Sequence, residues 1–314
     1  YWSFNGQMVT SPRITLTYKP NWKPDLLFRA SWGYYYQPPF YREMRGFDGT
    51  VNPNIKAQQS VHYLLSGDYN FKMWHRPFKL IVAGYYKEMK DLIPYEVDNT
   101  RIRYFAKNNS VGYTTGADVR INGDFIKGIE SWATLGFLKT MENISDDRKV
   151  TYFNAAGDTI IKGYTFDTKA TDSTVKYPGY IPRPTDQRIT FGMFFQDYLP
   201  KLPACKMYLN MQFGSGLPFG PPDHIRWKQV FRMPPYRRVD IGFAYQIIKE
   251  GHSLPKKNPF HSLKAMFISV EVFNLLQVNN TVSYTWVTDV TNRQYAVPNY
   301  LTRRQLNLKL QVKF

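Results

Sequence analysis

Apolar and polar residues alternate without interruption over the last ten positions of the chain, 305–314. The apolar set is Leu306, Leu308, Leu310, Val312 and Phe314, and the polar set is Gln305, Asn307, Lys309, Gln311 and Lys313. Successive side chains of a β-strand point to opposite faces of its sheet. The segment therefore predicts a strand with one apolar face and one polar face.

The same alternation recurs along the whole chain, whereas helical periodicity is almost absent. Regular alternation covers 111–122, 188–196, 206–213 and 238–247, and less regular strands are expected near 13–19, 25–36, 60–71, 78–92, 131–141 and 265–276. With the closing segment these make eleven strands. Their length of about ten residues exceeds the usual ~5–6 of globular sheets and suits a tilted crossing of a hydrocarbon layer.

The connections between these strands separate this chain from a soluble sandwich, which would show the same alternation. Short links near 19–25, 70–77, 122–129 and 197–204, and a middling one at 249–264, alternate with long ones near 37–59, 93–110, 142–187, 214–236 and 277–302. Short turns at one end and long loops at the other are typical of outer-membrane barrels. We therefore predict an all-β fold, a transmembrane antiparallel β-barrel.

Composition excludes several other classes. Aromatic residues make up 17% of the 314 residues, and disordered chains are poor in them. A single cysteine rules out a disulfide framework and any multi-cysteine metal site, and no apolar run approaches the ~18 residues of a transmembrane helix. Lys plus Arg is 41 against 24 Asp plus Glu, a net charge of +17, but the basic residues are dispersed among loops. We therefore expect no nucleic-acid partner.

The strand count bears on how the domain is organised. Single-chain outer-membrane barrels have an even number of strands and no open edge, whereas eleven is odd and is half of the ~22 strands of plugged transporters. The start at Tyr1 resembles neither an initiator Met nor a signal peptide. We expect residues 1–314 to be the C-terminal part of a single β-barrel domain, with the plug domain and the N-terminal strands absent from this sequence.

Four segments carry a resemblance to a known family. Asn-Pro-Asn-Ile-Lys-Ala-Gln-Gln-Ser at 52–60 resembles the Asn-Pro-x-Leu-Lys-Pro-Glu-x-Ser segment of TonB-dependent outer-membrane receptors, with departures at Ala57 and Gln58. Tyr-Arg-Arg-Val-Asp-Ile-Gly at 236–242, Val-Phe-Asn-Leu-Leu at 272–276 and the closing segment 304–314 are similar to the last strands of that family. The phrases at 35–41 and 298–302 resemble receptors of Bacteroidetes type.

The resemblance implies a location and a function. A TonB-dependent receptor lies in the outer membrane among lipid and lipopolysaccharide, and imports a scarce nutrient when the TonB energy-transducing complex acts on its plug, which is missing here. No bond is broken, so the resemblance implies neither an enzyme nor a cofactor. A lipoprotein lid, as in SusC-like importers, or other envelope subunits are further partners that the residues leave open.

The polar faces of the strands supply the first set of candidate residues. A charged side chain facing lipid at mid-membrane costs about 2–4 kcal/mol, so these charges are expected to face the lumen. The alternative is that they form structural ion pairs between strands. The lumen-facing polar wall is predicted to contain Asp118, Arg120, Arg238, Asp240, Glu271 and Lys309.

Aromatic residues in the long loops supply the second set, as candidates for contact with a ligand or partner. The alternative is a membrane-interface girdle, which we favour for Tyr34, Tyr35 and Tyr36. The loop candidates are Phe40, Tyr41, Phe219, Trp227 and Trp286.

No metal site is expected. The histidines are isolated in sequence, and we expect surface positions for His62, His75, His224, His252 and His261. The acidic loop 142–187 lacks the Asp-x-Asp-x-Asp-Gly spacing of a calcium loop, and Cys205 is expected to be a packed thiol.

Three functions stay open from the sequence. The first is TonB-dependent import across the outer membrane. The second is a structural or assembly component of an outer-membrane complex built on the same barrel, and an intact plug with a coupling box would argue against it. The third is a soluble all-β binding protein, which extraction without detergent would support.

Overall fold

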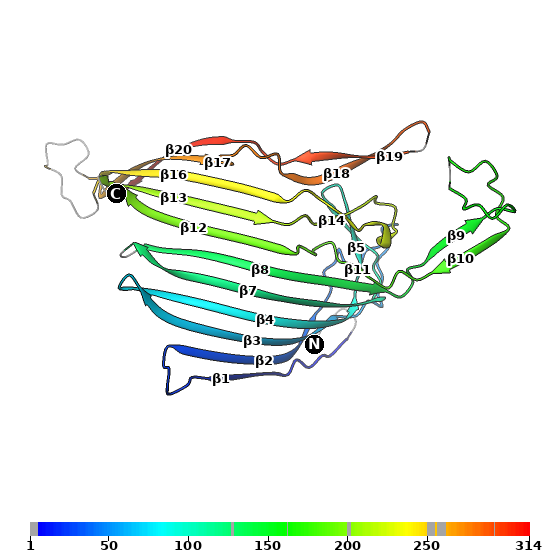
Figure 1. The fold of residues 1–314 in the computed structure, drawn as a ribbon, viewed down its shortest axis with the longest axis horizontal. Helices are drawn as coiled ribbons and strands as arrows, with labels where there is room; N and C mark the ends of the chain where they lie inside the picture. The colour runs from blue at the N-terminus through cyan, green and yellow to red at the C-terminus, as the bar shows by residue number, and fades with distance from the viewer. Residues whose placement is uncertain are drawn as a thin grey trace.

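The computed structural model describes residues 6–126, 129–161, 163–199, 202–249, 255, 262–291 and 293–314. One large antiparallel sheet dominates these residues, and its strands follow one another in chain order (Figure 1). The eleven strands of this meander are β1 (Arg13–Tyr18), β2 (Leu26–Gln37), β3 (Gln58–Met73), β4 (Arg76–Leu92), β7 (Ser110–Ile126), β8 (Ile129–Ile144), β12 (Ile189–Leu199), β13 (Leu202–Gly214), β16 (Tyr236–Ile248), β17 (Ala265–Phe273) and β20 (Gln305–Lys313). The eleven predicted strands are confirmed, and the sheet is open, with β1 and β20 as its edges.

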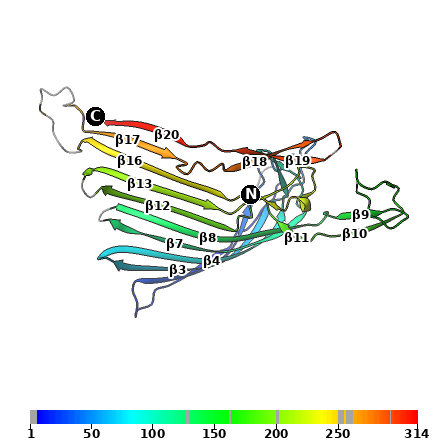
Figure 2. The same cartoon turned by 45° about the horizontal axis from the view of Figure 1, so that its top comes forward.

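Shorter elements occupy the long connections. They are β5 (Tyr95–Asp98), β6 (Arg101–Tyr104), β9 (Lys149–Phe153), β10 (Asp172–Lys176), β11 (Tyr180–Pro182), β14 (Pro218–Phe219), the 3₁₀ helix η1 (Arg226–Lys228), β15 (Phe231–Arg232), β18 (Thr281–Thr288) and β19 (Gln294–Tyr300). β11 pairs with β8 and joins the large sheet, and the other strands form hairpins β5–β6, β9–β10, β14–β15 and β18–β19. Figure 1 shows β5, β9, β10, β11, β14, β18 and β19 at the same end of the barrel strands, with β9 and β10 projecting farthest, as they also do in Figure 2. The expected hairpin within 277–302 is confirmed as β18–β19.

The opposite end of the sheet has short turns. β3 and β4 are joined by two residues, Trp74 and His75, whose φ angles of 52° and 59° match the left-handed backbone of a tight hairpin turn. The sorting of connections by end, predicted from the sequence, is therefore present where the structure describes the connections, and most of the predicted 249–264 link lies outside the described residues.

The register shows that the apolar side chains share one face of the sheet and do not form an interior. Leu308 lies opposite Val270, Val270 opposite Phe243, and Phe243 opposite Met207. Leu308 is 69% exposed and Phe243 is 40% exposed, so the apolar faces do not pack against one another. Such a face is stable only against lipid tails.

Two bands of aromatic rings bound this apolar face. One contains Tyr63, Tyr86 and Tyr113, with ring centroids 6.3 and 6.2 Å apart. The other lies near the short turns and contains Phe78 and Phe125, 5.0 Å apart. Eight residues separate Tyr86 from Phe78 along β4, a rise of about 27 Å, and the apolar band of outer-membrane barrels is about 25 Å tall.

One strand ends earlier than the sequence predicted. The segment 265–276 was expected to be a strand throughout, but β17 ends at Phe273 because Asn274 has a φ of 52°. That left-handed conformation turns the chain out of the sheet, and asparagine adopts it more readily than most residues.

Candidate functional site

The long connections pack against one another at one end of the sheet. The tip of the β5–β6 hairpin reaches β18–β19, where Ser283 Oγ donates a hydrogen bond to Asn99 Oδ1 at 2.8 Å and Asn299 Nδ2 donates to the same oxygen at 3.0 Å. These residues lie about 200 positions apart in sequence. The loops therefore form one cluster, which we call the loop cluster.

A small apolar core anchors the 38–57 loop in this cluster. Met44, Ile55 and Ile93 are buried together, and Tyr104 packs against them. The Asn52 side chain donates to the Ala106 carbonyl at 2.8 Å. The Asn-Pro-Asn-Ile segment that resembles a receptor motif therefore ties the 38–57 loop to the β5–β6 hairpin.

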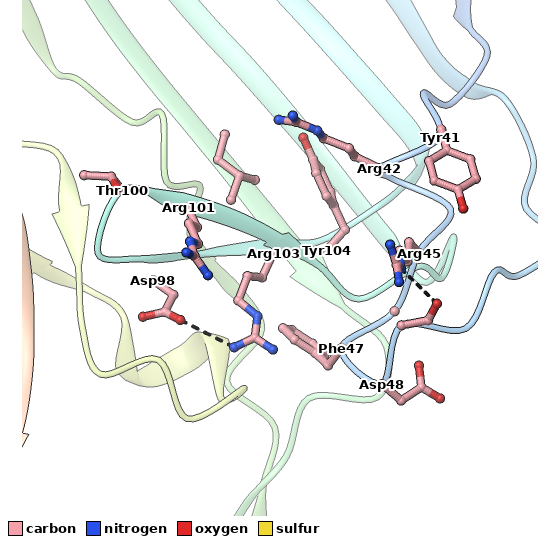
Figure 3. A pocket seen from close by; sticks show the side chains of 13 residues that line it. Tyr41, Arg42, Arg45, Phe47, Asp48, Asp98, Thr100, Arg101, Arg103 and Tyr104 are labelled. Carbon is pink, nitrogen blue, oxygen red and sulfur yellow. Dashed lines mark hydrogen bonds and ion pairs between the residues drawn. The ribbon is translucent and has the colours of Figure 1, made fainter.

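The two tied segments border an open cavity of about 960 Å³. Figure 3 shows Arg101 and Arg103, from β6, on one side and Tyr41 and Arg45, from the 38–57 loop, on the other. We call it the arginine cavity, and its side chains are those of Tyr41, Arg42, Arg45, Phe47, Asp48, Asp98, Thr100, Arg101, Ile102, Arg103 and Tyr104.

Some of the charges in the arginine cavity are held by local contacts. Arg103 Nη1 lies 3.4 Å from Asp98 Oδ2, and its guanidinium lies 5.2 Å from the centre of the Phe47 ring. Arg45 Nε donates to the Gly49 carbonyl at 2.9 Å. Hydrogen bonds from the Thr50 side chain and backbone lower the pKa of Asp48, which therefore stays ionised. Burial, followed by the nearby Glu43 carboxylate, raises the pKa of Tyr104, so its phenol stays protonated.

A second cavity of about 610 Å³ adjoins the first, because Ile102 and Tyr104 line both. It reaches the polar face of β2 and β3, where Arg13 lies 4.2 Å above the Tyr35 ring and Tyr35 stacks on His62 at 4.1 Å. We call it the polar-face cavity. The two cavities together connect the loop cluster with the polar side of the sheet.

Three carboxylates with fully buried side chains hold the 221–233 segment against the strand ends. Glu96 accepts from His224 Nδ1 at 2.8 Å, from the His224 backbone N–H at 3.1 Å and from Gln229 Nε2 at 3.0 Å. Asp186 accepts from the Thr140 backbone N–H at 2.7 Å and pairs with Arg188 and Arg232. These bonds cross between connections that are far apart in sequence, so they fix the loops relative to one another.

The third buried carboxylate, Glu142 at the end of β8, meets the buried guanidinium of Arg226. Arg226 Nη2 donates to Glu142 Oε1 at 2.9 Å and to the Pro182 carbonyl at 3.1 Å, and Nη1 donates to Gln229 Oε1 at 2.7 Å. Arg183 Nε lies 3.5 Å from the other Glu142 oxygen. The one local signal for this network in the sequence is that Glu142 continues the alternation of the polar face of its strand, one position beyond the predicted end at 141.

The structure brings two of the five predicted loop aromatics together. Phe219 stacks on Tyr284 at 4.3 Å and lies 6.2 Å from Trp286, so both candidates share an aromatic cluster between β14 and β18. Tyr41 lines the arginine cavity, and Phe40 beside it is 67% exposed. Trp227 lies apart in η1, with Lys149 Nζ at 5.5 Å and Lys228 Nζ at 5.7 Å from its ring.

The register places all six predicted wall residues on the polar face. Asp118 and Arg120 alternate with Val119 of the apolar face on β7, and Arg120 lies 5.6 Å from the Trp132 ring. Lys309 lies opposite Ser269, between Leu308 and Leu310 of the apolar face. Glu271 accepts from Asn307 Nδ2 at 2.8 Å.

Arg238 and Asp240 join two of the segments that resemble receptor motifs. Arg238 Nε donates to Asp240 Oδ1 at 2.7 Å, and the same oxygen accepts the Asn274 backbone N–H at 2.8 Å. Asp240 thus supports the turn that ends β17. The ring of Tyr208 lies across Gly242 so closely that a Cβ there would be 2.2 Å from it.

Two expectations for individual side chains are wrong. Tyr34 and Tyr36 lie on the apolar face, as a girdle requires, but Tyr35 points to the polar face, because strand side chains alternate. His224 lies at the surface as expected, with its side chain 46% exposed, but it is not isolated, since it pairs with buried Glu96 and packs 3.9 Å from the Phe47 ring. His62 is stacked on Tyr35, Cys205 is buried, and His252 and His261 lie outside the described residues.

Among the described residues, no group of three or more His, Cys, Asp or Glu side chains could hold a metal ion. Within the same part of the chain, no helix is long and apolar enough to cross a membrane.

Comparisons with known proteins agree with this architecture. The model of the family described as TonB dependent receptor-like, beta-barrel matches residues 1–280. The chain therefore belongs to this family, whose members lie in the outer membrane and act as receptors and transporters rather than enzymes. A search of curated proteins found no significant match.

Solved structures share the fold. They include the siderophore receptor PiuA from Acinetobacter baumannii (TM-score 0.58, 12% identity, covering 95% of this chain and 35% of that one). The copper transporter OprC (0.56, 14%, 96% and 39%) and the outer membrane transporter YddB from Escherichia coli (0.55, 12%, 98% and 41%) are also similar. This chain therefore spans between a third and a half of the length of these proteins.

Proposed function

We propose that this member of the TonB-dependent receptor family takes part in active import of a scarce nutrient across the outer membrane. The observation that carries this proposal is the pair of adjoining cavities, which lead from the loop cluster to the polar face of the barrel strands. A ligand that binds in the arginine cavity would pass Ile102 and Tyr104 to reach this polar face. Asp118, Arg120 and the other wall residues would then line its path.

The energy source and the rest of the barrel belong to the same proposal. The open edges at β1 and β20, together with the 35–41% coverage of similar chains, support the idea that these strands are the C-terminal part of a larger plugged barrel. The plug would connect this chain to the TonB complex, and the apolar face would contact lipid and lipopolysaccharide. The match to Bacteroidetes-type segments supports an origin in that group.

Depletion of nutrients from a defined medium tests the import function. The parent strain, a strain lacking the gene and a strain lacking TonB are grown in one medium, and the loss of each small molecule is followed by mass spectrometry. We expect at least one compound whose consumption needs both the gene and TonB. If the gene deletion changes the consumption of no compound that depends on TonB, the import function is refuted.

The projecting β9–β10 hairpin favours a second role in an envelope complex. Its connections carry Phe166, which is fully exposed, with Tyr164, Ile161 and Tyr177 at more than half of their accessible area. Exposed apolar groups of this kind mark contact surfaces, and a lipoprotein lid or another envelope subunit would fit there. Removal of the hairpin should release a co-purifying subunit while leaving the barrel assembled, whereas an unchanged complex would count against this role.

A further inference from the structure

Two guanidinium groups of the arginine cavity are available to a ligand. Within the described residues, the guanidinium groups of Arg42 and Arg101 make no hydrogen bond and no ion pair, although both exposed side chains line the cavity. Arg45 and Arg103, by contrast, have the partners Gly49 and Asp98. The guanidinium groups of Arg42 and Arg101 are therefore both free to donate hydrogen bonds to a ligand in the arginine cavity.

The charges of the arginine cavity do not cancel. Four arginines, Arg42, Arg45, Arg101 and Arg103, face two aspartates, Asp48 and Asp98, and the difference is a formal charge of +2. Asp98 is paired with Arg103, and Asp48 is held by hydrogen bonds from Thr50. Asp98 also lies opposite Arg101 in the β5–β6 pair, so one carboxylate is shared by Arg101 and Arg103. Two carboxylates are thus divided among four guanidinium groups, and the excess positive charge around the cavity favours the binding of an anion.

The remaining lining residues suit a small organic molecule. Tyr41, Phe47 and Tyr104 contribute flat apolar surface, and Phe47 is held by edge contact with Phe105 at 4.9 Å. The volume of about 960 Å³ lies within the range of small-ligand pockets. Guanidinium groups bind carboxylate and phosphate through two parallel hydrogen bonds, and neutral sugars offer no such match.

We propose that the arginine cavity binds a small organic anion carrying at least two carboxylate or phosphate groups, held by Arg42 and Arg101. Arg45 and Arg103 border the same space, and Tyr41 and Tyr104 contact the body of the ligand. The inference rests on the proposed import function, because it names the chemical class of the imported nutrient. It nevertheless has a direct binding test that does not require transport.

The test uses the full-length protein purified in an uncharged detergent. Binding of citrate and of pyrophosphate, with sucrose as a neutral probe, is measured by isothermal titration calorimetry at low and at physiological salt. We expect saturable binding of at least one anion that weakens as salt rises, and no binding of sucrose. Failure of both anions to bind would overturn the proposal.

Three variants locate the site. In the double variant Arg42→Gln and Arg101→Gln, anion affinity should fall at least tenfold, and its fold should be preserved because neither guanidinium has a protein partner. Arg101→Lys keeps the charge but loses the two-pronged geometry, so a smaller loss is expected. Arg293→Gln in the β18–β19 hairpin is the matched control, since it removes one exposed charge elsewhere. Equal affinity in the double variant and the control would overturn the assignment.

The outcomes also separate this inference from the import function. Anion binding that needs Arg42 and Arg101, without any TonB-dependent uptake, would support the site and refute import. TonB-dependent uptake of a neutral or cationic compound, unaffected by the double variant, would support import and overturn the anion site.

Discussion

Replacing Arg226 with methionine should loosen the loop cluster without unfolding the barrel. The Arg226 side chain is 1% exposed and that of Glu142 is 0% exposed, and they share a 2.9 Å hydrogen bond. Methionine fills a similar volume but leaves the Glu142 carboxylate with Arg183 as its remaining cationic neighbour, 3.5 Å away. Loss of one partner of a buried ion pair costs about 3–5 kcal/mol.

This free-energy cost should appear as easier local opening of the segment 225–233, which Arg226 holds against Glu142. The η1 region has few bonds of its own, and its Lys228 and Gln229 backbone N–H groups each donate to a carbonyl three residues earlier. Amide hydrogen exchange over 225–233 should therefore accelerate by roughly two to three and a half orders of magnitude, with the lower value expected because Arg183 remains. Exchange in β7 and β8 should not change.

A double variant checks the reasoning. Adding Glu142→Gln to Arg226→Met removes the uncompensated charge, so part of the lost protection should return. Arg293→Met, on the exposed β18–β19 hairpin, should leave exchange over 225–233 as in the wild type. If Arg226→Met accelerates exchange less than threefold, or if the second substitution gives no recovery, the buried ion pair does not hold the loop cluster together.

Three further predictions follow from other parts of the structure. Val82 lies midway between the two aromatic bands, so Val82→Arg should lower the free energy of unfolding in lipid by about 2–4 kcal/mol, as measured by urea titration. Ala83→Arg, on the polar face, should leave that free energy nearly unchanged in the same titration. Asn274→Ala removes the two side-chain hydrogen bonds with Val278 and the residue that favours a left-handed backbone, so a urea titration should show a loss of roughly 2–4 kcal/mol. Asn274→Gly should restore the backbone part, and full stability in the alanine variant would contradict this account. Hydrogen bonds from Arg293 and Thr291 lower the pKa of Asp289, so the stabilisation is present above the ordinary aspartate value and is lost as pH falls through the depressed one. Exchange protection of the Thr291 and Arg293 amides, which donate to Asp289, should hold from pH 7 to 5 and fall below about pH 4, and Asp289→Asn should abolish this pH dependence.

The barrel strands could be predicted from the sequence because their cause is local. Alternate residues of a strand point to opposite faces, so the position of a side chain such as Leu308 in the alternation decides whether it faces lipid or the lumen. This position follows directly from the order of residues. The lengths of the connections likewise follow from residue number alone, so the sorting of short turns and long loops needed no contact information. The segments at 52–60, 236–242 and 272–276 added the family for the same reason, since they are continuous in the chain.

The site could not be predicted because its partners are distant in sequence. Glu96 and His224 are 128 positions apart, and Glu142 and Arg226 are 84 apart. Taken alone, each of these residues is expected to be exposed to solvent, and the sequence predicts an isolated surface histidine at His224. The pairing depends on which loops the curved sheet brings to one end, and that is a property of the folded meander.

What the sequence determined by itself is therefore the repeating pattern: eleven strands, two chemically different faces and an end with long loops. Tertiary structure alone decided that Arg42 and Arg101 face the same cavity, that Asp240 supports Asn274, and that Tyr35 points inward to His62. The physical reason is the sequence separation of the interacting residues. Alternation and hairpin turns arise from neighbouring residues, whereas these buried charges are stable only because a partner from a distant part of the chain lies beside them.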